Sequence, residues 1–207
     1  MEGTHNWYKT LEEHIMLAFH TKEYTEAYTV YQTAKNHRDF KFLKGGNLEI
    51  WLLYEAYLFF IIKIGKMPNL TLGESIFKNF KLTKFLNDVS QFSSDKKGMN
   101  IPTLIIQYAL QITEKKRDQL VDRLEAMEQY VKRHVKSDDA VYRSHCFLKL
   151  LLNLSKFNYS KKLIAPKAKE LLAEIEASPI DIMEQGDRIE IMPFECLWIE
   201  MQPFLKP

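Results

Sequence analysis

Apolar residues that recur every three or four positions are the feature that most constrains the fold of this 207-residue chain. The first two stripes consist of Trp7, Leu11, Ile15 and Phe19, followed by Tyr24, Ala27 and Tyr31. This is the spacing of side chains along one face of an α-helix. Because few residues separate the stripes and small Ala27 lies between two tyrosines, the pattern predicts two closely packed antiparallel helices.

Similar stripes recur as far as the C-terminus, and the composition suits helices throughout. Of all residues 46% are hydrophobic, while only 7 are Gly and 7 are Pro. That balance favours helices over a sheet protein with many turns. We therefore predict an all-α fold, in which about four antiparallel helix pairs form a right-handed stack, an α-solenoid.

Helix boundaries follow from caps, glycines and prolines. The expected helices cover residues 5–20 with Thr4 as the N-cap, 21–38, 48–64, 77–89, 100–112, 120–134, 141–154 and 162–177. Residues 185–207 differ, because 188–191 alternate as in a short strand or extended segment and a last amphipathic helix follows Pro193. We expect this segment to cap the stack, so that residues 1–207 form a single helical-repeat domain.

The cysteines and the N-terminus bear on the compartment. Cys146 and Cys196 lie among apolar residues, 50 positions apart, and are expected to be small core residues in a reducing environment. The first residues lack the basic start and apolar core of a secretory signal. The most apolar stretch, 50–62, is too short to span a membrane and contains Glu55. We expect a cytoplasmic protein without a membrane-bound segment.

Residues that could carry chemistry do not cluster. The six histidines lack the spacing that places two metal ligands on one helix face, and Gly45 and Gly46 lack the Lys and Ser or Thr of a phosphate-binding loop. His145 and Cys146 are neighbours, yet consecutive helix residues point about 100° apart, so the histidine is not placed to activate the thiol. We expect no enzyme activity, no catalytic residues, no cofactor and no metal.

Two sets of side chains are candidates for binding a partner. They are Trp51, Tyr54 and Tyr57 in the third expected helix, and Gln107, Gln111, Arg143 and Lys149 in the fifth and seventh. The aromatic set lies where the concave groove of a stack would run, although burial between helix pairs is the commoner place for aromatic residues. The polar set belongs to the first helices of its pairs and would supply specificity on the inner face.

Basic residues are concentrated in one stretch, although the net charge of the chain is only +2. Residues 114–170 contain 14 basic and 8 acidic residues, whereas 171–207 contain 2 and 8. If the basic helices lay side by side, they could follow a phosphate backbone. Acids alternate with the basic residues, however, as on an exposed helix with salt bridges, and the acidic end of the chain could fold back on this region.

The first hairpin resembles a tetratricopeptide repeat. The positions at which that repeat alternates large and small residues are occupied by Trp7, Leu11, Ala18, Tyr24, Ala27 and Tyr31. The glycine after the first leucine and the closing proline are missing, and the expected pairs do not follow the regular period of about 34 residues, so the chain is tetratricopeptide-like. The stretch 142–198 also resembles the C-terminal end of large, uncharacterised bacterial helical-repeat proteins. The first resemblance implies a stack that offers a surface to a partner, and the second implies no known activity.

Together these observations predict a non-enzymatic scaffold that binds a peptide or a helix of a partner protein. Binding of nucleic acid through residues 114–170 is the alternative, and self-association through the first hairpin is a third possibility. No oligomeric state is predicted.

Overall fold

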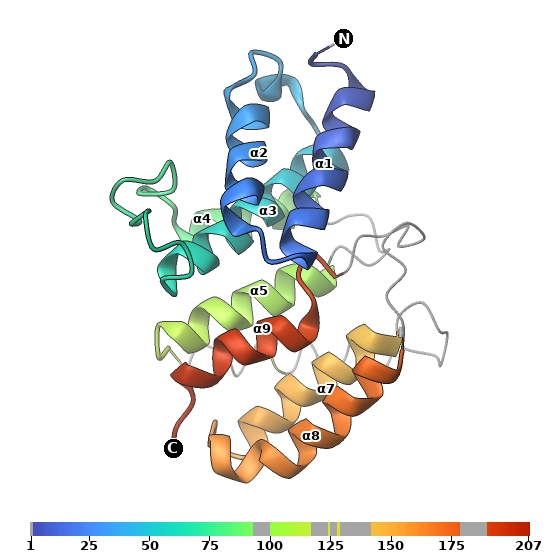
Figure 1. The fold of residues 1–207 in the computed structure, drawn as a ribbon, viewed down its shortest axis with the longest axis vertical. Helices are drawn as coiled ribbons and strands as arrows, with labels where there is room; N and C mark the ends of the chain where they lie inside the picture. Colours follow the sequence, from blue (N-terminus) through green and yellow to red (C-terminus); the bar gives the residue numbers. More distant parts are fainter. Residues whose placement is uncertain (1, 93–99, 117–123, 125–127, 129–141, 179–189) are drawn as a thin grey trace. The chain divides into compact units, whose positions relative to one another are not determined.

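The computed structural model describes residues 2–92, 100–116, 124, 128, 142–178 and 190–207. These residues form α-helices and short 3₁₀ helices joined by turns, and no β-strand occurs among them (Figure 1). The prediction of an all-α protein is confirmed for this part of the chain. The chain divides into two compact units, which we call unit 1 (residues 1–106) and unit 2 (residues 107–207). That the whole chain is a single helical-repeat domain stays a prediction.

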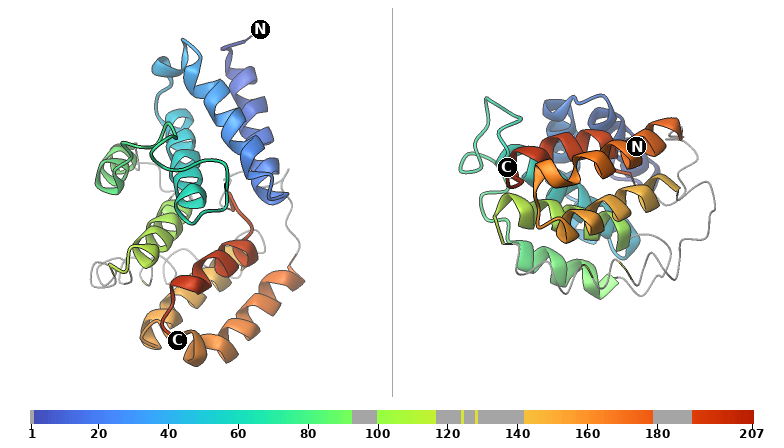
Figure 2. Two further views of the ribbon diagram at one scale, coloured as in Figure 1. Left: turned by 60° about the vertical axis from the view of Figure 1, so that its left-hand side comes forward. Right: turned by 90° about the horizontal axis from the view of Figure 1, so that it is seen from below.

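Unit 1 is built from four complete α-helices with described bounds. They are α1 (His5–His20), α2 (Tyr24–Asn36), α3 (Gly46–Lys63) and α4 (Leu82–Phe92), with the 3₁₀ helix η1 (Phe40–Phe42) after α2. The unit boundary falls inside α5 (Asn100–Thr113). Helices α1 and α2 lie side by side, α3 packs against α2, and α4 packs against α3 (Figure 2).

The bounds of α1 agree with the prediction from the sequence, and local interactions explain them. Thr4 has an extended backbone, and its Oγ1 accepts a hydrogen bond from the backbone N of Trp7 at 3.3 Å. This satisfies one of the N–H groups that lack a partner at a helix start. After α1, Lys22 has a φ of 64°, a left-handed conformation that turns the chain into α2.

Aromatic rings fill the core of unit 1, with Trp51 of α3 among them. The rings whose centres lie between 5.6 and 6.1 Å from that of Trp51 belong to Tyr8, Tyr31, Phe40 and Tyr54. Most of these contacts are T-shaped, the arrangement that places a positive ring edge on a negative ring face. Residues from α1, α2, η1 and α3 therefore meet at one indole.

Phe77 explains why the fourth helix differs from its prediction. The sequence predicts a helix from residue 77, but α4 begins at Leu82, and residues 71–80 form turns. Phe77 is buried, and its ring centre lies 5.7 Å from that of Tyr28 and 5.3 Å from that of Tyr31. Its apolar side chain thus packs on α2 instead of contributing to a helical stripe.

The most apolar stretch of the sequence, residues 50–62, lies within α3. Eleven residues of α3 are buried, among them Glu49. Burial within unit 1 explains why this stretch is so apolar. Among the helices that the structure describes, none combines the length and the hydropathy that a membrane crossing requires.

Unit 2 contains α7 (Tyr142–Lys156), α8 (Lys161–Ala177), α9 (Phe194–Met201) and the 3₁₀ helix η4 (Gln202–Phe204). Helices α7 and α8 lie side by side, and α9 packs against both. Asn158 and Tyr159 have φ values of 53° and 60°, so two left-handed residues form the turn between α7 and α8. Ser160 then caps α8, because its Oγ accepts a hydrogen bond from the backbone N of Leu163 at 3.4 Å.

The C-terminal segment agrees with the prediction in its helix and differs before it. A helix does follow Pro193, but the described residues Glu190 and Ile191 do not form a strand. After η4, the backbone N of Lys161 donates to Lys206 O at 2.7 Å, and the backbone N of Lys206 donates to Tyr159 O at 2.8 Å. The sixth expected helix, 120–134, lies outside the described residues except for 124 and 128, which are helical.

Candidate functional site

The aromatic set predicted to bind a partner lies inside unit 1. Trp51, Tyr54 and Tyr57 are each at most 1% exposed. The Tyr54 hydroxyl donates a hydrogen bond to Glu12 O at 3.2 Å, and the Tyr57 ring packs against Phe19 at 6.1 Å between ring centres. The structure therefore differs from the expectation of an open groove, because these rings pack between helices, and in this conformation they are shielded from a partner.

The polar set differs from the expectation in a similar way. Gln107 and Gln111 of α5 and Arg143 of α7 are buried in the structure, whereas Lys149 of α7 is exposed. Lys149 alone of the seven predicted residues is placed where a partner could contact it. A binding role for the set stays a prediction.

Arg143 has internal partners that account for its burial. Its Nε and Nη2 donate to the two carboxylate oxygens of Glu190 at 2.9 and 2.8 Å, and Nη2 also donates to Glu195 at 2.9 Å. Its Nη1 donates to the carbonyl oxygens of Ile175 and, at 2.7 Å, Ser178. Burial lowers the pKa of Arg143, but the hydrogen bonds and charges of the two carboxylates raise it by more. The guanidinium therefore joins α7 to the end of α8 and the start of α9.

Cys146 lies on α7, as Arg143 does, and takes part in a hydrogen-bonded cluster with a residue of α8. Its Sγ donates to Glu174 Oε2 at 3.3 Å, and the Tyr142 hydroxyl donates to the same oxygen at 2.8 Å. Burial, followed by the bond to Glu174, raises the pKa of Cys146 to about 11. The nucleophilic form of cysteine is the thiolate, so this environment keeps the sulfur unreactive at neutral pH.

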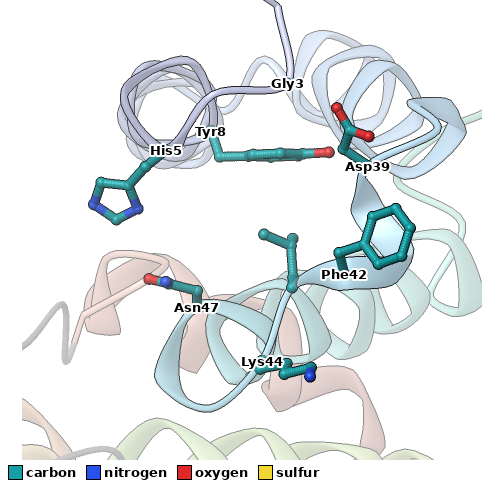
Figure 3. Close-up of a pocket in the computed structure, with 8 residues that line it drawn as sticks. Gly3, His5, Tyr8, Asp39, Phe42, Lys44 and Asn47 are labelled. Atoms are coloured by element: carbon teal, nitrogen blue, oxygen red, sulfur yellow. The ribbon is translucent and has the colours of Figure 1, made fainter.

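A pocket of about 440 Å³ lies in unit 1, where the start of α1 faces the segment between α2 and α3 (Figure 3). Its lining residues are Gly3, His5, Tyr8, Asp39, Phe42, Leu43, Lys44 and Asn47. They come from two segments more than thirty positions apart in the sequence. None of them belongs to the seven residues predicted to bind a partner.

Gly3 allows the first residues of the chain to approach this pocket closely. It has a φ of 78°, and a Cβ at this position would lie 2.3 Å from His37 Cε1 and 2.6 Å from Asp39 Oδ2. Both distances are shorter than any real contact of a Cβ atom. A side chain here would therefore require His37 and Asp39 to move, and the left-handed φ would add backbone strain.

Tyr8, His37 and Asp39 form a polar group beside the pocket. The backbone N of Asp39 donates to His37 Nδ1 at 3.3 Å, and the Tyr8 hydroxyl lies 3.5 Å from the same nitrogen. Because an amide nitrogen only donates, His37 Nδ1 is the acceptor in the bond with Asp39. Burial and the negative charge of Asp39 raise the pKa of Tyr8, so its hydroxyl stays protonated at neutral pH.

The mouth of the pocket is wide, since His5, Phe42, Lys44 and Asn47 are all exposed. Phe42 is 65% exposed, a high value for a phenylalanine. In Figure 3 His5 and Asp39 lie at opposite ends of the space, so they do not form an acid–base pair. The arrangement suits the binding of a side chain more than catalysis.

Residues 35–44, which we call the basic segment, connect α2 to the pocket. They contain Lys35, Arg38, Lys41 and Lys44 and one acid, Asp39. Phe40 of the same segment packs in the core, whereas Phe42 is exposed. In the sequence the signal for this segment is the spacing of its cations three positions apart with interleaved phenylalanines, a pattern that the predictions above did not use.

The basic stretch 114–170 is described only in part. Lys116 Nζ lies 2.7 Å from Glu114, and Lys167 pairs with Glu170, as expected for an exposed helix with salt bridges. Most of residues 117–141 lie outside the described part of the chain. Binding of nucleic acid by this stretch stays a prediction.

Comparisons with known proteins do not add a function. No protein-family model matches the chain, and no curated protein or solved structure is similar to it. Within the described residues, no group of three or more His, Cys, Asp or Glu side chains is placed to hold a metal ion. The proposal of a function therefore rests on the pocket and on the basic segment beside it.

Proposed function

We propose that this chain is a non-enzymatic scaffold that binds a peptide segment of another protein, with the pocket of unit 1 as the binding site. The observation that carries the proposal is the wide pocket with Phe42 exposed at its rim. Large apolar side chains exposed beside a concavity are typical of interaction surfaces.

The shape of the pocket favours a large partner over a small molecule. Its volume lies in the range of about 300–1,000 Å³ that is usual for ligand pockets, which bury most of their ligand. Here four lining residues are exposed, so a small molecule would remain largely in water. A side chain that belongs to a peptide would be covered from outside by the rest of that peptide.

We also propose that the helices form antiparallel pairs stacked as in a tetratricopeptide-like solenoid, with α9 as its cap. Support comes from α1 with α2 and from α7 with α8, since each pair lies side by side and is joined by a short turn. The location that we propose is the cytoplasm. The buried free thiol of Cys146 suits a reducing compartment.

An array of random-sequence peptides, probed with the intact protein, tests the proposed function. We expect a reproducible subset of peptides to bind, and we expect Phe42→Ala to weaken that binding about tenfold or more, as loss of a central anchor does. Because Phe42 is exposed, the substitution should leave the fold intact, which circular dichroism can check.

Leu17→Ala is the matched control for this experiment. Leu17 is another apolar residue of unit 1, 53% exposed, and it is not among the residues that line the pocket. This variant should bind the same peptides as the parent protein. If no peptide binds, or if both variants lose binding equally, the pocket is not a peptide-binding site.

A further inference from the structure

The basic segment presents accessible positive charge at the rim of the pocket. Arg38, Lys41 and Lys44 are exposed, and the side chain of Arg38 is 88% exposed. The fourth cation, Lys35, is also exposed but is paired, since its Nζ lies 3.4 Å from Glu55 Oε2. Three cations therefore remain on the outer side of the segment.

Asp39, the single carboxylate of the segment, has a cation beside it. Its Oδ1 lies 3.9 Å from Nε of Arg38, the residue that precedes it in the chain. The approach of Gly3 covers the Oδ2 side of the carboxylate. An arriving partner therefore meets more positive than negative charge at this rim.

Apolar surface adjoins these cations. Phe42 and Leu43 line the pocket, and Lys41 Nζ lies 5.1 Å from the centre of the Phe42 ring. In Figure 3 the side chain of Lys44 points away from the space between Tyr8 and Asn47. Apolar surface and exposed cations are thus neighbours along this segment, a combination that is common at protein interfaces.

We propose that this pocket binds an acidic peptide segment of a partner protein, an inference that rests on the proposed function and names its partner class. One apolar side chain of the segment enters the pocket and packs against Phe42 and Leu43. Carboxylates on either side of that anchor pair with Arg38, Lys41 and Lys44. The anchor supplies most of the affinity, and the charges select acidic sequences and speed association.

A peptide fits this surface better than a nucleic acid does. Proteins that follow a phosphate backbone place many cations along a groove, often with aromatic rings on which bases stack. Here only Lys44 among the three exposed cations lines the pocket, and the wall of the pocket contains a carboxylate, Asp39. A continuous chain of phosphates would pass close to that carboxylate, whereas a peptide can place its acids beside the cations alone.

Binding of three degenerate peptide pools to the full-length chain tests the proposal. The pools share one length and a central Phe or Leu, and differ only in flanking residues, which are acidic, neutral or basic. A single-stranded oligonucleotide serves as the fourth probe. We expect the acidic pool to bind about tenfold more tightly than the neutral pool, since each exposed pair contributes about 0.2–1 kcal/mol.

A charge-reversal variant locates the effect. Lys41→Glu combined with Lys44→Glu should remove the preference for acidic peptides while leaving the neutral pool unaffected. Lys78→Glu combined with Lys84→Glu is the control, because it changes the net charge equally at two exposed lysines that do not line the pocket. The control variant should keep the preference of the parent protein.

The amide signals of glycines show where the peptide binds. Gly3 lines the pocket, and Gly45 and Gly46 lie in the chain between two of its lining residues. Gly65 and Gly73, in contrast, follow the C-terminal end of α3. On addition of the acidic pool, nuclear magnetic resonance should show shifts for the first three glycines and none for the other two.

The outcomes separate this proposal from the proposed function. Equal or tighter binding of the neutral or basic pool would overturn the acidic class and leave peptide binding standing. Binding of the oligonucleotide alone would replace both by nucleic-acid binding. Failure of every pool to bind would overturn the proposed function itself, and with it the partner class.

Discussion

Unit 1 packs a cluster of aromatic rings around Trp51, whereas unit 2 packs leucines and one stacked pair, Phe147 and Phe194, and adds a buried arginine. In unit 1 the indole of Trp51 meets four aromatic rings from three helical segments and its own helix. In unit 2 the buried side chains of α7 include Leu148, Leu150, Leu151 and Leu154, and Arg143 bonds to two carboxylates and two carbonyls.

This difference separates two ways of fixing helices against each other. Ring packing depends on volume and shape, and it tolerates changes of surface charge. The arginine cluster depends on direction and charge, and loss of the arginine leaves Glu190 buried without its cation. Each unit should therefore be most sensitive to a different kind of substitution.

The largest effect is expected from Trp51→Ala in unit 1. Removal of a buried indole should lower the free energy of unfolding by about 4 kcal/mol, through lost burial and the cavity left behind. Urea denaturation followed by circular dichroism measures the loss. Trp7→Ala, at a half-buried ring, should cost about 1 kcal/mol. Equal losses in the two variants would contradict a core centred on Trp51.

The next effect is expected from Arg143→Ala in unit 2. It should cost about 3 kcal/mol, because Glu190 would remain buried without its cation. The fluorescence of Trp198 on α9 can report unfolding of this unit, since Arg143 also bonds to the start of α9. Arg38→Ala, at an exposed arginine, should change stability by less than about 0.5 kcal/mol. If the two variants were alike, the cluster would contribute nothing measurable.

Alkaline pH should then weaken both units through one tyrosine in each. Burial, as the main cause, raises the pKa of Tyr31 and of Tyr108 well above 10.0. Above pH 10 the unfolded chain loses these protons and the folded chain keeps them, so stability is full below pH 10 and falls as pH rises. The expected slope is about 1.4 kcal/mol per pH unit for each tyrosine.

Urea titrations at a series of alkaline pH values, with tyrosinate absorbance, measure this effect. Tyr31→Phe and Tyr108→Phe should each reduce the slope of the decline by the contribution of one tyrosine, about 1.4 kcal/mol per pH unit. A decline of unchanged slope in both variants would assign the alkaline sensitivity to other groups.

The smallest effects are expected at the two helix caps. Thr4→Ala and Ser160→Ala should each cost about 1 kcal/mol, because each hydroxyl accepts a hydrogen bond from a backbone N–H in the first turn. Ser160→Ala should cost more, since this hydroxyl also donates to Pro207 O at 3.1 Å. Thr29→Ala, on the exposed side of α2, is the control for thermal unfolding. A larger loss of stability for Thr4→Ala than for Ser160→Ala would contradict this prediction.

Helix positions were predicted well where the signal was local. The helix His5–His20 has its predicted bounds and cap, and α8 begins one residue before its predicted start and ends where expected. The prediction for the fourth helix was wrong at Phe77, because apolar spacing cannot distinguish a helical stripe from a turn that packs on another helix.

The pocket was not predicted, and its composition shows why. Its walls come from residues 3–8 and 39–47, which lie far apart in the sequence. No spacing rule relates them, and the regular spacing of cations in the basic segment does not indicate which residues lie opposite it. Conversely, Arg143 was predicted on the inner face because it belongs to the first helix of its pair, and its partner Glu190, 47 positions away, could not be inferred from spacing.

By itself, the sequence determined that the chain is helical and where several helices begin and end. Propensity, periodicity and capping act between residues within one or two helical turns, so they can be recognised along the chain. Only the tertiary structure decided that the predicted aromatic set lies in the core, that Arg143 meets Glu190 and Glu195, and that Gly3 approaches Asp39. These contacts join distant segments, and their existence depends on the path of the whole chain.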